Sequence, residues 1–298
     1  MTVRKILRGI GYSVAGLVGL VVLAGAATYG LSESRMARTF AVPDHALTPS
    51  TDSASLASGA RLVKVKGCVD CHGANLGGSV MIDNAALGRL AAPNLTVGGR
   101  GAELEPKDWE RAIRHGVRRD GSPLRVMPAN EFTGIADDEL EAMVGYIRSQ
   151  PAVATRQPPV RVGPVIRAMF VAHQFDLLPA ELIDHSKAHI AHIDAEPTPK
   201  YGEYVAAGCK GCHGPGMSGG KIPGAPPDWK AAANLTPTGI GRYSESDFIK
   251  ILRTGTRPDG SMVDTLMPYR LTKEMTDVEL KALFSYLKTL PPKEFGNR

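Results

Sequence analysis

The first feature of the hydrophobic pattern is an uncharged, mainly apolar run between Arg8 and Glu33. A helix rises about 1.5 Å per residue and crosses the hydrocarbon core of a bilayer with about 20 residues, so this run predicts a membrane-spanning helix. The basic residues before it predict a cytoplasmic N-terminus and an exported remainder; they are Arg4, Lys5 and Arg8. We therefore expect residues 1–32 to be an N-terminal anchor. The alternative is a signal peptide, because Ala24-Gly25-Ala26 resembles a cleavage site.

Two segments lack a sustained apolar period. Residues 33–54 are rich in Ser, Thr, Ala and Pro, and they predict a tether between the anchor and the first domain. Residues 151–196 begin with a Pro-rich stretch and continue with two short patterns at 165–178 and 180–194. We expect these two patterns to form short helices within a connector between two domains.

Two longer segments have clear helical periodicity, with apolar residues at i, i+3, i+4 and i+7. These residues are Leu140, Met143, Val144 and Ile147, and again Leu280, Leu283, Phe284 and Leu287. Thr276 and Glu279 predict a capping box for the second helix, whereas the first has only Asp137 as a cap. Pro151 and Pro291 end the two helices.

These two helices close two copies of one domain, which we place at 55–150 and 197–298. Cys68 and Cys209 are 141 positions apart, and the string Asn-Leu-Thr at 94–96 returns at 234–236, 140 positions later. Shorter helical patterns precede each pair of cysteines, and others run from Trp109 to His115 and from Phe248 to Thr254. Alternating strand patterns are nearly absent, so the expected fold class is mostly α.

The composition is that of a globular protein with one unusual property. Hydrophobic residues make up 43% and charged residues 22%, but aromatic residues only 6%. Domains so poor in aromatic side chains need another source of buried apolar bulk, which a large cofactor would supply. The formal net charge of +5 includes no basic cluster with interleaved aromatics, so no nucleic-acid partner is expected.

All four cysteines lie in two Cys-x-x-Cys-His strings. They are Cys68, Cys71, Cys209 and Cys212, and the histidines are His72 and His213. A disulfide across so short a loop stabilises little, a zinc site needs four ligands, and a thioredoxin-like motif needs a βαβ context. Covalent haem attachment explains each position, because two thiols bind the porphyrin as thioethers and the histidine ligates the iron. We therefore expect two covalently attached haem c groups.

Each iron then needs a sixth ligand. Met127 follows His72 by 55 residues and Met267 follows His213 by 54, and both methionines precede a proline. A histidine–methionine pair raises the reduction potential of the iron, as suits an electron carrier. We predict Met127 and Met267 as axial ligands, with Met262 as the competitor in the second copy.

The connector contributes a row of histidines. At i, i+4 and i+7 of the expected helix they are His185, His189 and His192. Such a row is most often a solvated helix face, which we expect here; metal binding or iron ligation is the alternative. His115 is matched by Thr254 in the second copy, which argues against an iron-ligand role for it.

Each copy resembles a class I c-type cytochrome domain. The strings "NLT", "DW…IRHG…DG…MP" and "YIRSQP" are similar to domains in cytochrome c subunits of bacterial membrane-bound dehydrogenases of the alcohol and gluconate type. Those subunits typically carry three such domains, whereas this chain has two. The resemblance implies that Tyr146 and Tyr286 pack the last helix against the first. It also implies haem propionate contacts for these residues: Asn94, Arg114, Asn234 and Arg253.

The function that follows is transfer of single electrons by a membrane-anchored dihaem cytochrome, not an enzyme by itself. The anchor and its flanking charges predict the bacterial inner membrane, with the haem domains in the periplasm. Expected redox partners are a dehydrogenase or quinol-oxidising complex as donor, and an oxidase or small cytochrome as acceptor. A tightly bound subunit of a dehydrogenase or oxidase complex is one alternative, and a dihaem enzyme such as a peroxidase is another.

Overall fold

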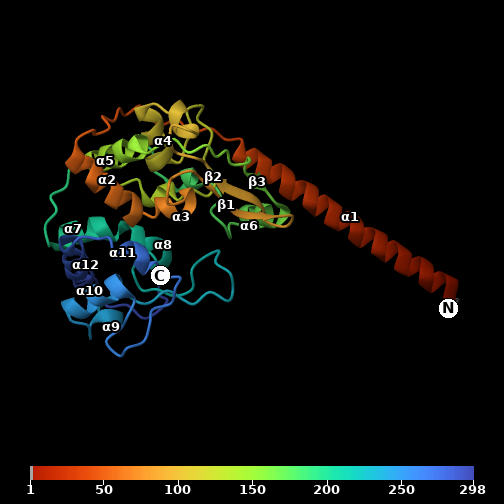
Figure 1. Cartoon of the computed structure of the whole chain (residues 1–298). Coiled ribbons are helices and arrows are strands. Elements are labelled where there is room, and N and C mark those ends of the chain that lie inside the picture. The colour runs from red at the N-terminus through yellow and green to blue at the C-terminus, as the bar shows by residue number, and fades with distance from the viewer. Residues whose placement is uncertain (1–2) are drawn as a thin grey trace.

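The structure, a computed structural model, describes residues 3–298, and its longest element is the helix α1, Val3–Met36. α1 projects away from two helical domains (Figure 1). By length and composition it could cross a membrane. The helix continues beyond the expected end of the anchor at residue 32, because its last turn packs on the connector. Arg35 stacks on the ring of Phe170 and bonds to Glu181 at 2.5 Å.

The first domain contains four α-helices and a β-hairpin. They are α2 (Ser53–Val65), α3 (Cys68–His72), β1 (Ser79–Asn84), β2 (Gly88–Ala92), η1 (Arg100–Glu103), α4 (Pro106–His115), η2 (Ala129–Glu131) and α5 (Asp137–Ser149). Its apolar core includes Trp109 from α4 and Leu140 and Met143 from α5. The hairpin is strand structure that the apolar pattern did not predict.

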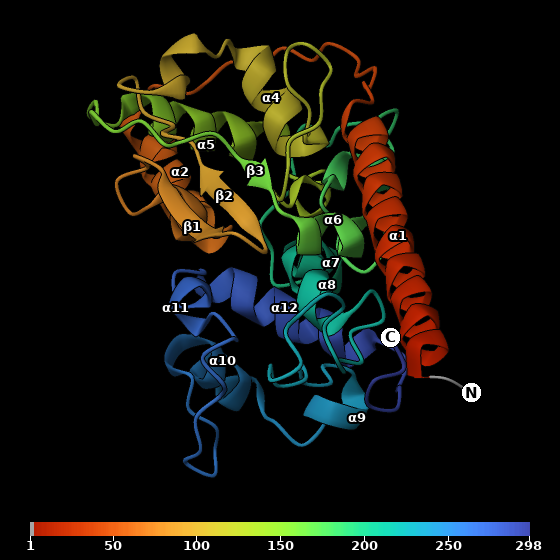
Figure 2. The ribbon, with the colours of Figure 1, turned by 90° about the vertical axis from the view of Figure 1, so that its right-hand side faces the viewer.

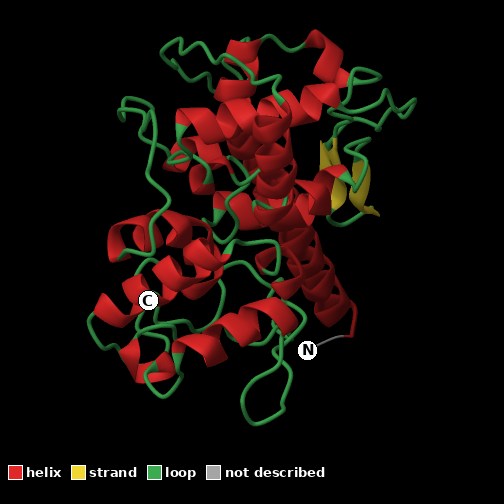
Figure 3. Ribbon diagram, turned by 60° about the vertical axis from the view of Figure 1, so that its left-hand side comes forward, coloured by secondary structure: helices red, strands yellow, loops and turns green. Residues whose placement is uncertain are grey.

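The second domain repeats this order of helices without a hairpin. Its elements are α7 (Pro199–Val205), η4 (Ala206–Cys209), α8 (Lys210–His213), α9 (Pro237–Ile240), α10 (Glu245–Thr254), α11 (Tyr269–Thr272) and α12 (Asp277–Thr289). The capping box expected for the last helix is confirmed, since Glu279 N–H donates to Thr276 and Thr276 N–H donates to Glu279. Figure 3 shows that helices dominate both domains, as expected.

The connector packs on both α1 and the first domain. It contains β3 (Arg161–Val162), α6 (Pro164–Val171) and η3 (Pro179–Leu182). β3 pairs antiparallel with β2, so the sheet order is β1-β2-β3. Figure 2 shows α6 beside the C-terminal part of α1, where Met36 joins a small core with Ile166 and Phe170.

The expected helix over 180–194 is wrong beyond Leu182, where the chain is irregular. Two carbonyl groups of this irregular segment accept hydrogen bonds from the first domain instead. Asp137 N–H donates to Ile190 O at 2.8 Å, and Asp138 N–H donates to Ala191 O at 3.4 Å. The first N–H groups of a helix need acceptors outside the helix. The N-cap residue of α5 is Ala136, whose side chain cannot accept a hydrogen bond. The connector therefore caps α5, and Asp137 is not the cap that we expected.

The expected tether also lies on the first domain. Phe40 N–H donates to Gly121 O at 2.9 Å, and Ser50 N–H donates to Glu141 O at 3.2 Å. Leu47 is buried in the first core. The segment after α1 therefore follows a defined path over α4 and α5, because its backbone and one apolar side chain find partners there.

The first and last helices of each domain approach closely at a glycine. In the first domain Gly59 lies against the carbonyl group of Ala142 and the Cβ of Tyr146; a side chain at Gly59 would collide with that carbonyl. Gly202 lies against Ala282 and Tyr286 in the same way. Tyr146 and Tyr286 thus lie at the helix contact that the resemblance implied.

The two domains exchange equivalent contacts. Arg61 of α2 binds Glu279 of α12 at 2.8 Å, and Tyr204 of α7 donates to Glu139 of α5 at 2.5 Å. Glu139 and Glu279 occupy matching positions in the two copies. Each first helix therefore reaches the last helix of the other domain, as in a two-fold symmetric pair.

The close approach at Gly59 predicts the effect of adding one methyl group. Alanine normally stabilises a helix by about 1 kcal/mol over glycine, but overpacking a core typically costs about 1–3 kcal/mol. We expect Gly59→Ala to lower the unfolding free energy of the first domain by about 1–2 kcal/mol, measured by urea denaturation and circular dichroism. Gly134→Ala is the matched control, because nothing lies near that Cβ position. A Gly59→Ala protein as stable as the wild type would contradict the contact.

Candidate functional site

The two Cys-x-x-Cys-His strings form short helices at equivalent places. α3 carries the first, and η4 and α8 carry the second. A glycine with positive φ follows each histidine: Gly73 has φ 79° and Gly214 has φ 79°. Only glycine adopts this backbone without strain, so the chain can leave each helix directly after its histidine. This explains why both motifs are followed by glycine.

All four cysteines of the described chain are free thiols. Burial raises the pKa of Cys68 to about 12 and that of Cys209 to about 11. Burial also raises the pKa of Cys71 and Cys212. The thiols are therefore protonated at neutral pH. Each pair lies three positions apart on about one helical turn, which fits two thioether attachment points.

Both histidines are buried and oriented by a backbone carbonyl group. His72 Nδ1 lies 2.9 Å from Pro93 O, and His213 Nδ1 lies 2.7 Å from Ala233 O. A carbonyl oxygen only accepts, so Nδ1 carries the hydrogen and Nε2 keeps its lone pair. Burial lowers the pKa of both imidazoles, which keeps them neutral. A neutral imidazole with a carbonyl-bound Nδ1–H is the form that ligates a metal through Nε2.

The repeated Asn-Leu-Thr string builds the loop that supplies this carbonyl group. Asn94 Oδ1 accepts from Thr96 N–H at 2.9 Å and from its hydroxyl at 2.8 Å. Asn234 Oδ1 accepts from Thr236 at 2.9 and 2.7 Å. Each asparagine directly follows the residue whose carbonyl group holds the histidine. The sequence contained this signal as a repeat, but only the structure relates it to the imidazole.

The four residues proposed to contact propionates have protein partners. Asn94 donates to Val153 O at 2.6 Å, and Asn234 donates to Lys293 O at 2.7 Å. These bonds hold the segment after the last helix. Each of the two arginines binds the first residue of the last helix in its own domain. Arg114 lies 2.6 Å from Asp137 of α5, and Arg253 donates to Asp277 of α12 at 2.6 Å. Propionate contact stays a prediction for these side chains.

The predicted methionines border the same cores as the cysteines. Met127 packs with Cys68 against the core of the first domain, and Met267 packs with Cys209 against that of the second. Met262 is 53% exposed, and its sulfur accepts a hydrogen bond from Thr256. Of the two methionines considered in the second copy, the structure brings only Met267 to the core that contains the motif.

A buried donor without a partner is the remaining feature of the first core. Trp109 is 2% exposed, and its indole Nε1–H has no hydrogen-bond partner among residues 3–298. The matching residue, Phe248, has no such group. An unpaired buried N–H is costly, and a carboxylate of a bound porphyrin is a suitable acceptor. The sequence patterns gave no reason to expect an unpaired donor at Trp109.

The two motifs face each other across the domain boundary. Asp70, within the first motif, binds Arg270 at 2.9 Å, three residues after Met267. Gly211, within the second motif, packs against the carboxylate end of the Glu131 side chain. In Figure 1, α3 and α8 lie at facing edges of the two domains.

The connector histidines do not share a helix face. His192 is exposed and binds Asp138 at 2.5 Å. His189 lies with His115 beside the buried Glu110, and His185 lies 2.9 Å from His115 between their Nδ1 atoms. The expectation of one solvated row is therefore wrong for two of the three, because the irregular backbone turns them toward α4.

Comparisons with known families assign both copies. Residues 54–147 match the family described as cytochrome c oxidase, cbb3-type, subunit III, and residues 201–291 match the cytochrome c family. Each match includes one Cys-x-x-Cys-His motif and the methionine predicted to pair with it.

Similar proteins include the cytochrome c subunit of alcohol dehydrogenase (quinone) from Gluconacetobacter polyoxogenes, 30% identical over 83% of this chain and 58% of the relative. The subunit of that name from Gluconobacter oxydans is 29% identical over 80% and 55%. The gluconate 2-dehydrogenase cytochrome c subunit of Pantoea cypripedii is 25% identical over 79% and 59%. The chain thus spans less than two thirds of these relatives. It is a cytochrome c protein with two tandem domains, homologous to the cytochrome c subunits of alcohol and gluconate dehydrogenases.

Proposed function

We propose that this chain carries two covalently attached haem c groups and transfers single electrons. The attachment residues are Cys68, Cys71, Cys209 and Cys212, and the axial ligands are His72, Met127, His213 and Met267. Each group, when bound, supplies an iron centre that alternates between two oxidation states by one electron. The observation that carries the proposal is the buried, neutral imidazole with a carbonyl-bound Nδ1–H, found at the same place in both copies.

The protein's own part is to fix the ligands. The carbonyl groups of Pro93 and Ala233 set the ring orientation and tautomer of the two histidines, and such outer bonds raise ligand basicity. The proline after each methionine restricts the loop that would present the thioether. Ligands held this firmly keep one geometry in both oxidation states, which suits electron transfer rather than chemistry on a substrate.

The domain contacts support passage of electrons within the chain. The Asp70–Arg270 ion pair and the packing of Gly211 on Glu131 hold each attachment motif against the short helix that follows the other domain's methionine. Two centres attached at these motifs would lie on either side of one protein boundary. We infer that, with both groups bound, this arrangement would let an electron pass from one domain to the other.

We propose a dehydrogenase as the electron donor, because the similar proteins are named as subunits of such enzymes. The acceptor would be an oxidase or a small cytochrome. α1 would anchor the chain in the bacterial inner membrane, with both domains on the periplasmic side. An anchor raises the effective concentration of the chain near membrane-bound partners.

The number of haem groups tests the first proposal. We expect two covalently bound haems per purified chain by the pyridine haemochrome assay, because each copy has its own pair of thiols. Replacing Cys68 and Cys71 together by alanine should leave one, and so should replacing Cys209 and Cys212. A wild-type chain with fewer than two covalent haems would overturn the proposal.

The methionine assignment has a separate test. We expect Met127→Ala and Met267→Ala each to lower the reduction potential of one centre, on the scale of roughly tenths of a volt, because the thioether favours the reduced iron. Optical redox titration measures both potentials. Met262→Ala is the control and should change neither. A shift in Met262→Ala without one in Met267→Ala would exchange the two assignments.

Membrane attachment is tested by fractionation. Because α1 is long and apolar, we expect the mature chain to remain in the membrane pellet after an alkaline carbonate wash and to need detergent for release. A variant in which a cleavable signal replaces residues 1–32 should be soluble. A wild-type mature chain that starts after Ala26 and is soluble would show a cleaved signal peptide instead.

A further inference from the structure

Glu110 on α4 is a buried carboxylate outside the cytochrome sites. It is 0% exposed, and neither carboxylate oxygen has a hydrogen-bond partner within the described chain. Arg114 Nη1 forms an ion pair with Oε1 at 3.8 Å but donates no hydrogen bond to it, and a buried carboxylate without hydrogen bonds is destabilising. The nearest nitrogen is His115 Nε2, 3.2 Å from Oε1, and it too is buried without a hydrogen-bond partner.

A chain of hydrogen bonds sets the tautomer of His115. His185 Nε2 lies 3.1 Å from Ala180 O and therefore carries a hydrogen, so in the neutral ring Nδ1 accepts. His115 Nδ1 lies 2.9 Å from that acceptor and so donates to it. The neutral His115 ring then points a lone pair from Nε2 into the space beside Glu110. Two acceptors face each other, and a cation between them would satisfy both.

His189 of the connector completes a set of three. Its Nε2 lies 3.8 Å from Glu110 Oε1, and the three ligand atoms all lie within 4.8 Å of one another. In a tetrahedral zinc site with bonds of about 2.0–2.1 Å, ligand atoms are separated by about 3.3 Å. The separations of Glu110 Oε1 from His115 Nε2 and His189 Nε2, 3.2 and 3.8 Å, are close to this value. Two imidazoles and one carboxylate are a typical zinc donor set.

We propose that Glu110, His115 and His189 bind one divalent transition-metal ion of the Zn²⁺ type, with water as a fourth ligand. The ion would join the connector to α4. His185 would act as the outer partner of His115, a role that metal-bound histidines commonly require. His189 is 21% exposed at its side chain, which leaves a route for the ion.

Metal binding requires one rearrangement. Arg114 Nη1 lies 2.8 Å from His189 Nδ1, so this nitrogen now accepts. A ligating Nε2 needs the hydrogen on Nδ1, which Asp137 Oδ1 at 3.7 Å can accept after a small ring movement. Arg114 keeps the hydrogen bond from Nη2 to Ile135 O and the ion pair with Asp137. The N–H released by Arg114 then faces Glu110 Oε1, at 3.8 Å.

The duplication shows that these side chains are not needed for the fold. The positions of Glu110 and His115 are occupied in the second copy by Ile249 and Thr254, on a helix of the same length. Arg114 is matched by Arg253, and both bind the start of the last helix. The fold keeps the arginine, whereas the candidate ligands occur only where the connector packs.

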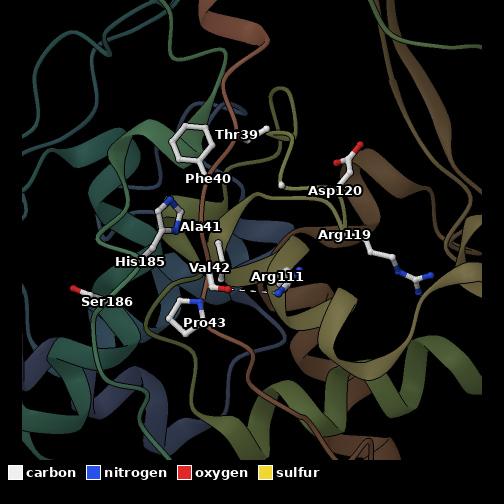
Figure 4. A pocket seen from close by; sticks show the side chains of 11 residues that line it. Thr39, Phe40, Ala41, Val42, Pro43, Arg111, Arg119, Asp120, His185 and Ser186 are labelled. Carbon is white, nitrogen blue, oxygen red and sulfur yellow. Dashed lines mark hydrogen bonds between the residues drawn. The ribbon is translucent and has the colours of Figure 1, made fainter.

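Figure 4 shows the surroundings of the outer partner. His185 lies beside Phe40 and Ala41 in a shallow pocket between the segment after α1 and the helix that carries Arg111. Phe40 packs edge-on against the His185 ring at 5.5 Å between centroids. This contact holds the ring that orients His115, so the site joins three segments that are distant in sequence.

Zinc binding to the full, haem-loaded chain without a histidine tag tests the proposal. We expect one zinc per chain by mass spectrometry after dialysis, in addition to haem iron. X-ray absorption at the zinc edge should show nitrogen and oxygen neighbours at about 2.0–2.1 Å with imidazole scattering. His115→Thr and Glu110→Ile install the residues of the second copy and should weaken binding by more than the roughly 10–100-fold that loss of an outer partner costs.

The matched control is His192→Ala, which removes an exposed histidine of the same connector and should leave the zinc content unchanged. His189→Ala should abolish binding without altering the haem optical spectrum, which verifies folding. A wild-type chain that takes up no more zinc than His115→Thr would overturn the proposal, and a proton on His115 would then compensate Glu110. Equal loss of zinc in His192→Ala and His115→Thr would overturn it as well.

Discussion

The close crossing of the first and last helices is the constraint on which each domain depends. At Gly59 and Gly202 the backbone of one helix lies directly on a carbonyl group of the other, and no side chain fits between them. The first helix leads into the cysteine motif, and the last follows the methionine loop. Fixing these two helices therefore fixes where thiols, imidazole and thioether lie relative to one another.

Within that frame the imidazole is set by a second local device. A carbonyl group accepts a hydrogen bond from Nδ1–H of the histidine. An Asn-x-Thr turn directly after that carbonyl group keeps the carbonyl group in place. The same asparagine holds the segment after the last helix through its amide. One side chain thus couples the closing of the domain to the orientation of the motif histidine. This coupling explains why the string recurs in both copies.

The two copies have diverged where the rest of the chain meets them. The contacts of Arg61 with Glu279 and of Tyr204 with Glu139 are nearly symmetric. The connector and the segment after α1, in contrast, cap α5 and pack beside Glu110 in the first domain, whereas the connector meets the second domain at Gly224, close to Gln174. The first domain is therefore the one through which α1 is attached. The second is held by the exchanged helix contacts, which also bring its motif to the boundary.

The sequence by itself determined the long apolar helix, the duplication, the periodic helices and the Cys-x-x-Cys-His motifs, since these are local patterns or repeated strings. It did not predict the irregular path of 183–194, the cap of α5 or the partners of the Asn-Leu-Thr string. Periodicity reports which face of a regular element is buried. It carries no information on a backbone whose hydrogen bonds go to distant residues, as at Ile190. Only the tertiary structure decided these, because their partners lie about 50 or more positions away, as for Asn94 and Val153.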